Sequence, residues 1–186
     1  DDGGSTGILR EEFGILPPGD VRRSLVALAR TDNEVLAQLF NYRFEEGAGL
    51  TGHSFGNLML TALERLTGSF DLAVKEAGRI LSIQGRVLPV TLKNAKLYAE
   101  LENGKVVRGE TNIDIPKYDS GSAIKKIWLK PRAVVNPEVS AAILGADAVL
   151  IGPGDLYTSL IPNFLVKGMS DVLKKKREDE LYNKEK

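Results

Sequence analysis

The chain has 186 residues, enough to bury the core of one ordinary domain, and its 25 basic residues balance 25 acidic ones. A net charge of zero provides no overall basic field, so we expect no nucleic-acid partner. The absence of cysteine excludes disulfide and thiolate chemistry, and the absence of a long apolar run or a leader predicts a cytoplasmic protein without membrane insertion.

The first half of the chain has the apolar periodicity of helices, interrupted by loops rich in glycine and proline. Residues 1–7 have the composition of a loop, and two prolines keep residues 14–19 irregular. Asp20 and Ser69 are placed to cap helices, and a capping-box pattern occupies residues 31–34. The expected helices cover residues 8–13, 20–30, 34–42, 53–66 and 70–81.

The period changes after residue 85, where the pattern indicates strands. Asn103-Gly104 is a strong hairpin turn between two of them. Asn136, followed by a proline, opens a helix that ends near Gly145, and Pro162 interrupts an apolar helical stretch over residues 159–166. The expected strands cover residues 86–91, 95–101, 105–110, 124–129 and 148–151.

A loop of glycine, hydroxyl and carboxylate residues follows the apolar run 148–151. Open α/β proteins place anion sites in such loops, at the carboxyl end of a buried strand. The alternative is a strand-to-helix turn in which the polar side chains act only as caps, and we favour the ligand loop by about two to one. Its candidate ligand-binding residues are Gly152, Gly154, Asp155, Tyr157, Thr158 and Ser159.

The opening loop has a similar composition. Gly3, Gly4 and Ser5 are candidates for binding a phosphate group through backbone N–H and hydroxyl donors. Asp2 and Asp20 cannot bind phosphate directly, but together they could share one Mg²⁺ ion with it. Taken one at a time, the first is better explained as a turn residue and the second as a helix cap.

His53 is the only histidine, so with no cysteine in the chain we expect no zinc site. It lies at the start of a predicted helix, where backbone N–H groups can face an anion and Ser54 or Asn57 can bond a sugar or base. The alternative is a capped helix with a surface imidazole. Arg22 is a candidate phosphate clamp, although arginine at such positions is more often a surface residue.

The residues discussed so far fall within a series of motifs that resembles the gluconeogenesis-factor (YvcK-like) family. The resemblance runs in order over about the first 172 residues. The motifs are Asp1 to Gly7, Glu12-Phe13-Gly14, Pro17 to Arg22, Leu39 to Phe44, Gly52 to Asn57, Gly85 to Thr91 and Gly152 to Ser159.

The resemblance implies a Rossmann-like, three-layer α/β fold with a mostly parallel sheet and a small β-hairpin insertion. Members of the family are cytoplasmic bacterial proteins that bind UDP-sugars, notably UDP-N-acetylglucosamine, and support cell shape and cell-wall synthesis during gluconeogenic growth. The family is related to the Mg²⁺-dependent 2-phospho-L-lactate transferases (CofD-like). In those relatives, metal-binding carboxylates occupy the positions of Asp2 and Asp20, and nucleotide-site segments match Asn57 and residues 152–159.

The sequence departs from the family at both ends. Family members begin with a strand and a Gly-Gly-Gly-Thr-Gly loop, so we expect a single domain over residues 1–172 that lacks this strand and its phosphate cradle. Residues 173–186 are almost all charged and carry no apolar stripe, so we expect a frayed helix or a disordered tail.

Three functions are compatible with these residues. The first is a UDP-sugar-binding regulator without catalysis, favoured because no general base is obvious. The second is a transferase acting on a nucleotide-diphospho donor, with Mg²⁺ neutralising the diphosphate. The third is an interaction protein whose loops are only turns. Phe40, Tyr42 and Phe44 are candidates for a homo-oligomer interface, with burial in the core as the alternative.

Overall fold

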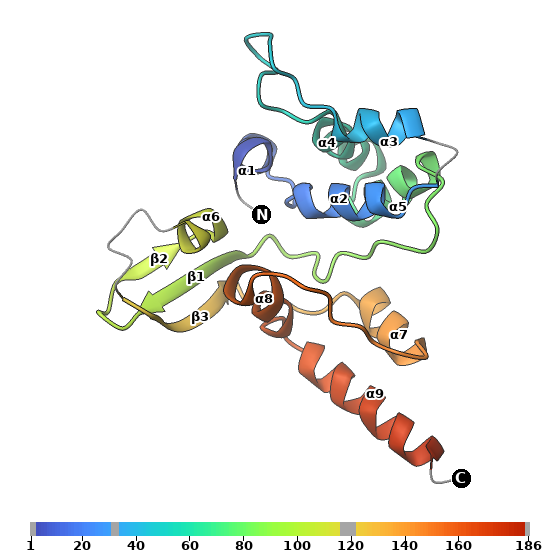
Figure 1. The fold of residues 1–186 in the computed structure, drawn as a ribbon, viewed down its shortest axis with the longest axis vertical. Coiled ribbons are helices and arrows are strands. Elements are labelled where there is room, and N and C mark those ends of the chain that lie inside the picture. Colours follow the sequence, from blue (N-terminus) through green and yellow to red (C-terminus); the bar gives the residue numbers. More distant parts are fainter. Residues whose placement is uncertain (1–2, 31–33, 116–121, 185–186) are drawn as a thin grey trace. The chain divides into compact units, whose positions relative to one another are not determined.

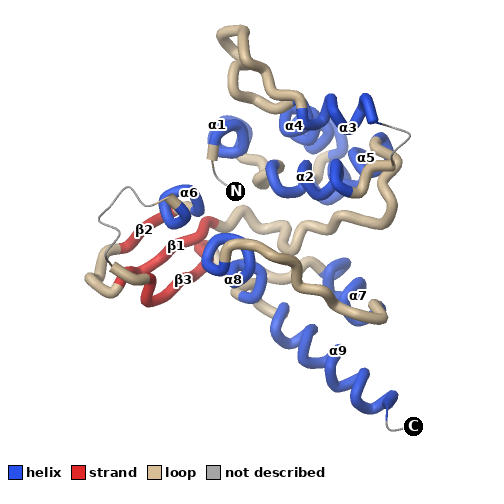
Figure 2. The backbone as a smooth tube through the Cα atoms, in the orientation of Figure 1, coloured by secondary structure: helices blue, strands red, loops and turns tan. Residues whose placement is uncertain are grey.

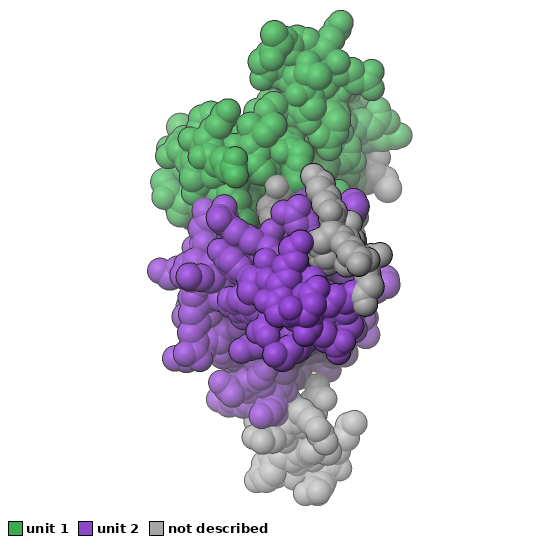
Figure 3. Space-filling view, turned by 90° about the vertical axis from the view of Figure 1, so that its left-hand side faces the viewer, with its two compact units in different colours: residues 1–89 green, residues 90–186 purple. Residues whose placement is uncertain are grey.

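The computed structural model describes residues 3–30, 34–115 and 122–184 (Figure 1). The chain divides into two compact units, residues 1–89 and residues 90–186, which Figure 3 shows in different colours. No helix in the described part of the chain is both long and apolar enough to cross a membrane.

The first unit is built from helices. They are α1 (Gly4–Phe13), α2 (Gly19–Ala27), α3 (Glu34–Asn41), α4 (Phe55–Thr67) and α5 (Phe70–Ile80). The core lies between α2, α3, α4 and α5 and includes Leu25, Phe40, Leu60 and Leu81, all fully buried. An exposed loop, residues 45–52, projects from the connection between α3 and α4 (Figure 2).

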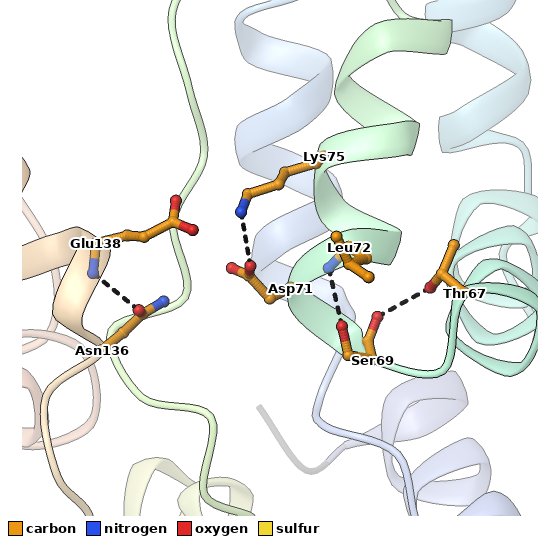
Figure 4. Close-up of polar contacts among 7 residues, drawn as sticks. All are labelled: Thr67, Ser69, Asp71, Leu72, Lys75, Asn136 and Glu138. Atoms are coloured by element: carbon orange, nitrogen blue, oxygen red, sulfur yellow. Dashed lines mark hydrogen bonds and ion pairs between the residues drawn. The ribbon is translucent and has the colours of Figure 1, made fainter.

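Local capping explains where α4 and α5 begin. The Ser54 hydroxyl accepts a hydrogen bond from the Asn57 N–H at the start of α4. The Ser69 hydroxyl accepts one from the Leu72 N–H at 3.3 Å, so Ser69 caps α5 as expected from the sequence (Figure 4). Between the two helices, Gly68 adopts the left-handed conformation at the C-terminus of α4.

The second unit contains a small antiparallel sheet with strand order β2-β1-β3. Its strands are β1 (Lys96–Leu101), β2 (Val106–Arg108) and β3 (Ile124–Lys130). The Asn103-Gly104 hairpin is confirmed, with Gly104 at φ +82 and Leu101 donating its N–H to the Lys105 carbonyl. One face of the sheet buries Leu97, Ala99, Leu101 and Val107 against Ile113.

Helices complete this unit. They are α6 (Glu110–Asp114), α7 (Pro137–Gly145), the π-helical turn η2 (Leu156–Leu160), α8 (Ile161–Phe164) and α9 (Met169–Lys184). As predicted, Asn136 caps α7, its side-chain oxygen accepting the Glu138 N–H at 3.0 Å (Figure 4). A second apolar cluster of this unit joins Ala133, Val166 and Met169. The charged tail is helical from Met169 to Lys184, and Leu173 packs on that cluster.

Two expected strands are absent from the described residues. Residues 86–91 and 148–151 have no ladder partner and are irregular, and Leu150 is 94% exposed rather than buried. An apolar run becomes a strand only when another strand satisfies its backbone groups. The described residues therefore form a mixed α/β structure with a small antiparallel sheet, and the mostly parallel Rossmann-like sheet is not seen among them.

Two helix starts also differ from the prediction. Helix α1 begins at Gly4, so Ser5, which was expected in a loop, lies in its first turn. Helix α2 begins at Gly19, and Pro18, whose ring fixes φ near the helical value, is its N-cap. Asp20 is therefore a first-turn residue and not the cap. The capping box expected over residues 31–34 lies mostly outside the described residues.

Candidate functional site

The N-terminal turns of α1 and α4 meet in a group of polar side chains. The Asn57 side-chain amide donates to the Ser5 hydroxyl at 3.2 Å and to the Thr6 hydroxyl at 3.3 Å. The Ser5 hydroxyl also lies 3.1 Å from Nδ1 of His53. The structure thus brings together Ser5, His53 and Asn57, which the sequence placed in two separate motifs. We call Ser5, Thr6, His53 and Asn57 the polar cluster.

The chain around the loop 45–52 fixes His53 at this place. The His53 carbonyl accepts the Phe44 N–H at 3.0 Å, and the Phe44 carbonyl accepts the Gly52 N–H at 2.8 Å. The Arg43 guanidinium donates to the Gly52 carbonyl on the same connection. These bonds close the loop at its base, so that His53 enters α4 in a defined position.

The polar cluster is removed from solvent although it is made of polar groups. Ser5, Thr6, Ser54 and Asn57 each expose less than 5% of their surface, and His53 is also buried. Asn57 Oδ1 has no hydrogen-bond partner among the described residues. An unpaired buried acceptor costs about 1–3 kcal/mol, so this oxygen is poised to accept a bond from a ligand N–H or O–H group.

Arg22 of α2 is buried beside the first turn of α4, with only 7% of its surface exposed. Its guanidinium donates to the Asn41 side-chain oxygen, while its Nε has no partner in the described part of the chain. Burial lowers the pKa of Arg22 from its ordinary value, and the charges of Arg23 and Arg43 lower it further, against a smaller raising effect of Asp20. Among the described residues no carboxylate forms an ion pair with Arg22, and a buried cation of this kind favours the approach of an anion.

A glycine on α4 makes room for this arginine. A Cβ atom on Gly56 would lie 2.6 Å from the Phe40 carbonyl oxygen and 2.8 Å from Cδ of Arg22. Both distances are shorter than any real van der Waals contact. Gly56 therefore lets the Arg22 side chain lie directly against the N-terminal turn of α4, where the helix dipole also favours an anion.

The second predicted site, the loop of residues 152–159, lies in the other unit, and the Asp155 side chain forms capping hydrogen bonds within this loop. Asp155 Oδ1 accepts the Tyr157 and Thr158 N–H groups at 3.0 Å and the Thr158 hydroxyl at 2.9 Å. The Thr158 hydroxyl, followed by its N–H, lowers the pKa of Asp155 from its ordinary value. The geometry is that of a helix cap, and a ligand-binding role for Asp155 stays a prediction.

The other residues of this loop are mostly exposed. Gly152 has open space where a Cβ would be, whereas a Cβ on Gly154 would lie 3.0 Å from Cβ of Ser159. Gly154 thus makes room for the helix that follows it, and phosphate binding by this loop stays a prediction.

The expected metal pair is not assembled within the described residues. Asp20 is exposed, and one of its oxygens lies 3.8 Å from the Arg23 guanidinium. Asp2 lies outside the described residues. In the described ranges no group of three or more histidine, aspartate or glutamate residues is arranged to hold a metal ion. Mg²⁺ binding by Asp2 and Asp20 stays a prediction.

Sequence reasoning missed two members of the site. Thr6 is 2% exposed and bonds Asn57, and Asn41 bonds Arg22. The only available signal for Thr6 was its position beside Ser5 in the opening motif. Gly3 is the N-cap of α1, and Gly4 enters the helix at φ +48, so the two expected phosphate-binding glycines form the helix start itself.

Comparisons with known proteins match nearly the whole chain. Residues 1–184 match the family described as 2-phospho-L-lactate transferase CofD. The gluconeogenesis factor of Halalkalibacterium halodurans is 45% identical over 184 residues, which are 98% of this chain and 55% of that protein. The gluconeogenesis factor of Bacillus subtilis is 44% identical over 183 residues, 98% of this chain and 56% of that protein.

A solved structure agrees with these matches. A crystal structure of a UPF0052 family member from Bacillus halodurans has a TM-score of 0.86 and 45% sequence identity, and the match covers 94% of this chain and 55% of that one. The chain therefore spans about half the length of the relatives it matches.

Proposed function

The chain belongs to the CofD family, together with the gluconeogenesis factors, and on this premise we propose that it binds a UDP-sugar such as UDP-N-acetylglucosamine. In this proposal it acts as a cytoplasmic regulator that supports cell shape and cell-wall synthesis during gluconeogenic growth. The name of its relatives supports the metabolic setting.

One observation carries the ligand assignment: near the first turn of α4, the Arg22 guanidinium of α2 keeps one unbonded donor and the Asn57 side chain of α4 keeps one unbonded acceptor among the described residues. The Nε of Arg22 and the Oδ1 of Asn57 are both buried and both lack a partner among the described residues. Asn57 is the neighbour of Gly56 in the first turn of α4, and Gly56 packs against the Arg22 side chain. A nucleotide-diphosphate ligand supplies both complements, anionic phosphate oxygens and N–H or O–H donors on its base and sugars.

The positions of the carboxylates favour a regulator over a catalyst. Among the described residues of the first unit, none places a carboxylate in the polar cluster, and a general base must lie within hydrogen-bond reach of the proton it removes. The alternative function is an Mg²⁺-dependent transferase acting on a nucleotide-diphospho donor. The description of the matching family supports that alternative. Under it, Asp2 and Asp20 would hold the Mg²⁺ ion, as the sequence predicts.

Calorimetric titration tests the proposal. The protein is titrated with UDP-N-acetylglucosamine, with and without Mg²⁺, and with GDP as the comparison ligand. Saturable UDP-sugar binding that does not require Mg²⁺, with no product after long incubation, is the expected result. Binding that requires Mg²⁺ and prefers GDP would replace the regulator with the transferase.

A pair of adjacent arginines on α2 provides a matched control. Arg22→Gln removes the buried guanidinium, and we expect roughly 10- to 150-fold weaker UDP-sugar binding, the range of a charge-assisted hydrogen bond. Arg23→Gln removes the same charge from a side chain that is 70% exposed, and its affinity should stay within about twofold of the parent because exposed charges contribute little. Equal losses in both variants would show that Arg22 does not contact the ligand.

A further inference from the structure

The outer face of the three-stranded sheet carries basic and aromatic side chains, whereas its buried face is apolar. The strand register and the alternation of side chains place one set of residues on this outer face. We call this set the basic face. It consists of Lys96, Tyr98, Glu100, Val106, Arg108, Lys126, Trp128 and Lys130.

The aromatic side chains of the basic face form a stack across the sheet. Tyr98 and Trp128 lie directly opposite each other on β1 and β3, with ring centroids 5.6 Å apart and an interplanar angle of 16°. The Arg108 guanidinium lies 6.0 Å from the centroid of the Tyr98 ring. The stack therefore runs from Arg108 through Tyr98 to Trp128, which lies on β3 at one edge of the three-stranded sheet.

The charges around this stack are almost all of one sign. Lys126 and Lys130 flank Trp128 on its own strand, on the same face. The one acidic residue of the face, Glu100, already accepts a bond from Lys125 at 2.7 Å. The basic side chains of this face outnumber its single acidic one, so the local field is positive although the chain as a whole has no net charge.

One pairing in the register argues against a purely structural origin. Lys96 and Lys130 lie directly opposite each other on β1 and β3. Like charges in that position destabilise a sheet, whereas an anion bound between them would remove the repulsion. Charged side chains on edge strands also discourage unwanted strand pairing, but this accounts only for the residues of the edge strands β2 and β3 and not for Lys96 on the central strand β1.

We propose that the basic face binds single-stranded nucleic acid. A base continues the stack on the outer side of Trp128, and phosphates lie near Lys126, Lys130 and Lys96. Sheet faces that combine stacking aromatics with basic side chains are the usual solution for this ligand. An anionic membrane is less well matched, because Val106 is the one aliphatic side chain on the face. An acidic peptide would make no use of the stacked rings.

Trp128 is the only tryptophan of the chain, so its fluorescence reports on this face alone. The protein is titrated with an oligouridylate, with emission of Trp128 as one readout and anisotropy of a fluorescein-labelled oligonucleotide as the other. We expect quenching of Trp128 on binding. We also expect the logarithm of the binding constant to fall with the logarithm of salt concentration at a slope of about −2, for three phosphates contacted.

Substitutions separate stacking from charge. Trp128→Leu should weaken binding by about 5- to 150-fold, while Trp128→Phe, which keeps a ring in the Tyr98 stack, should recover much of the affinity. Lys126→Ala combined with Lys130→Ala should reduce the salt slope by about 1.4. The matched control removes two exposed lysines from helix α9, Lys174→Ala and Lys175→Ala, and should leave the affinity and the slope unchanged.

Three results would overturn the proposal. One is Trp128 emission that does not change when the protein is saturated with the oligouridylate. Another is a loss of affinity in the α9 control equal to that of the sheet variant, which would mean binding to positive charge in general. The third is tighter binding of polyglutamate or of vesicles containing phosphatidylglycerol than of the oligouridylate, which would assign the face to a protein or a membrane. None of these results depends on whether a UDP-sugar binds.

Discussion

The close approach of α4 to Arg22 and to the end of α3 can be tested by adding a single methyl group. Gly56→Ala places a Cβ atom 2.6 Å from the Phe40 carbonyl oxygen and 2.8 Å from Cδ of Arg22. The carbonyl belongs to the backbone of α3 and cannot move alone, so the helices must separate. Overpacking of this kind costs about 1–3 kcal/mol. Replacing glycine by alanine in a helix gains about 0.5–1 kcal/mol in return.

We therefore expect Gly56→Ala to lower the free energy of unfolding by about 1–2 kcal/mol. For a chain of this length, that corresponds to a fall in Tm of about 2–8 °C. Urea unfolding followed by circular dichroism measures the first quantity, and calorimetry measures the second. Because Arg22 must move, UDP-sugar affinity should fall as well.

Two other helical glycines provide a graded comparison. A Cβ on Gly78 would touch only the end of the Ile83 side chain, at 3.0 Å, and a Cβ on Gly145 would meet nothing within 4 Å. Gly78→Ala should change stability little, and Gly145→Ala should leave it unchanged or raise it by up to about 1 kcal/mol. If Gly56→Ala proved as stable as Gly145→Ala, the close contact of α4 with Arg22 and Phe40 would be contradicted.

Two further predictions concern the core and the second loop. Leu60→Ala should lower the free energy of unfolding by about 2–5 kcal/mol because Leu60 is fully buried. Leu66 lies on the same helix but is 82% exposed, so Leu66→Ala should change that free energy by less than about 0.5 kcal/mol. Equal costs in urea titrations would contradict the assigned buried face of α4. The pKa of Asp155 is lowered from its ordinary value of 3.8 by bonds to its carboxylate, so its contribution to stability is complete above that value and is lost as pH falls through the lowered pKa. The amide resonances of Tyr157 and Thr158 should therefore titrate below pH 3.8. Asp155→Asn keeps a capping side chain but cannot ionise, so it should abolish that titration. Amide shifts that titrate equally in the variant would show that Asp155 is not the cap.

Elements set by short-range hydrogen bonds could be predicted from the sequence. The Asn103-Gly104 hairpin and the caps Ser69 and Asn136 were located correctly, because a turn or a cap depends on residues within three positions along the chain. Residues 86–91 and 148–151 were wrongly assigned as strands, because an apolar run says nothing about whether a pairing strand lies beside it.

The same distinction applies to the site. Ser5, His53 and Asn57 could each be named from local motifs, but their hydrogen bonds span 48 and 52 residues and follow from tertiary packing alone. The orphan oxygen of Asn57 and the burial of Arg22 depend on every neighbour at once, so no sequence pattern could have indicated them. The predicted capping role of Asp20 failed for a local reason, since Pro18 already begins the helix.

The bonds between α1 and α4 have a consequence for how the first unit folds. Helix α1 has ten residues, a length at which an isolated helix is marginal in water, so it depends on contacts that close a chain segment of about 50 residues. Detachment of α1 is then a local opening that also removes Ser5 and Thr6 from the polar cluster. A ligand bound at this cluster would slow hydrogen exchange throughout α1, including at amides it never touches.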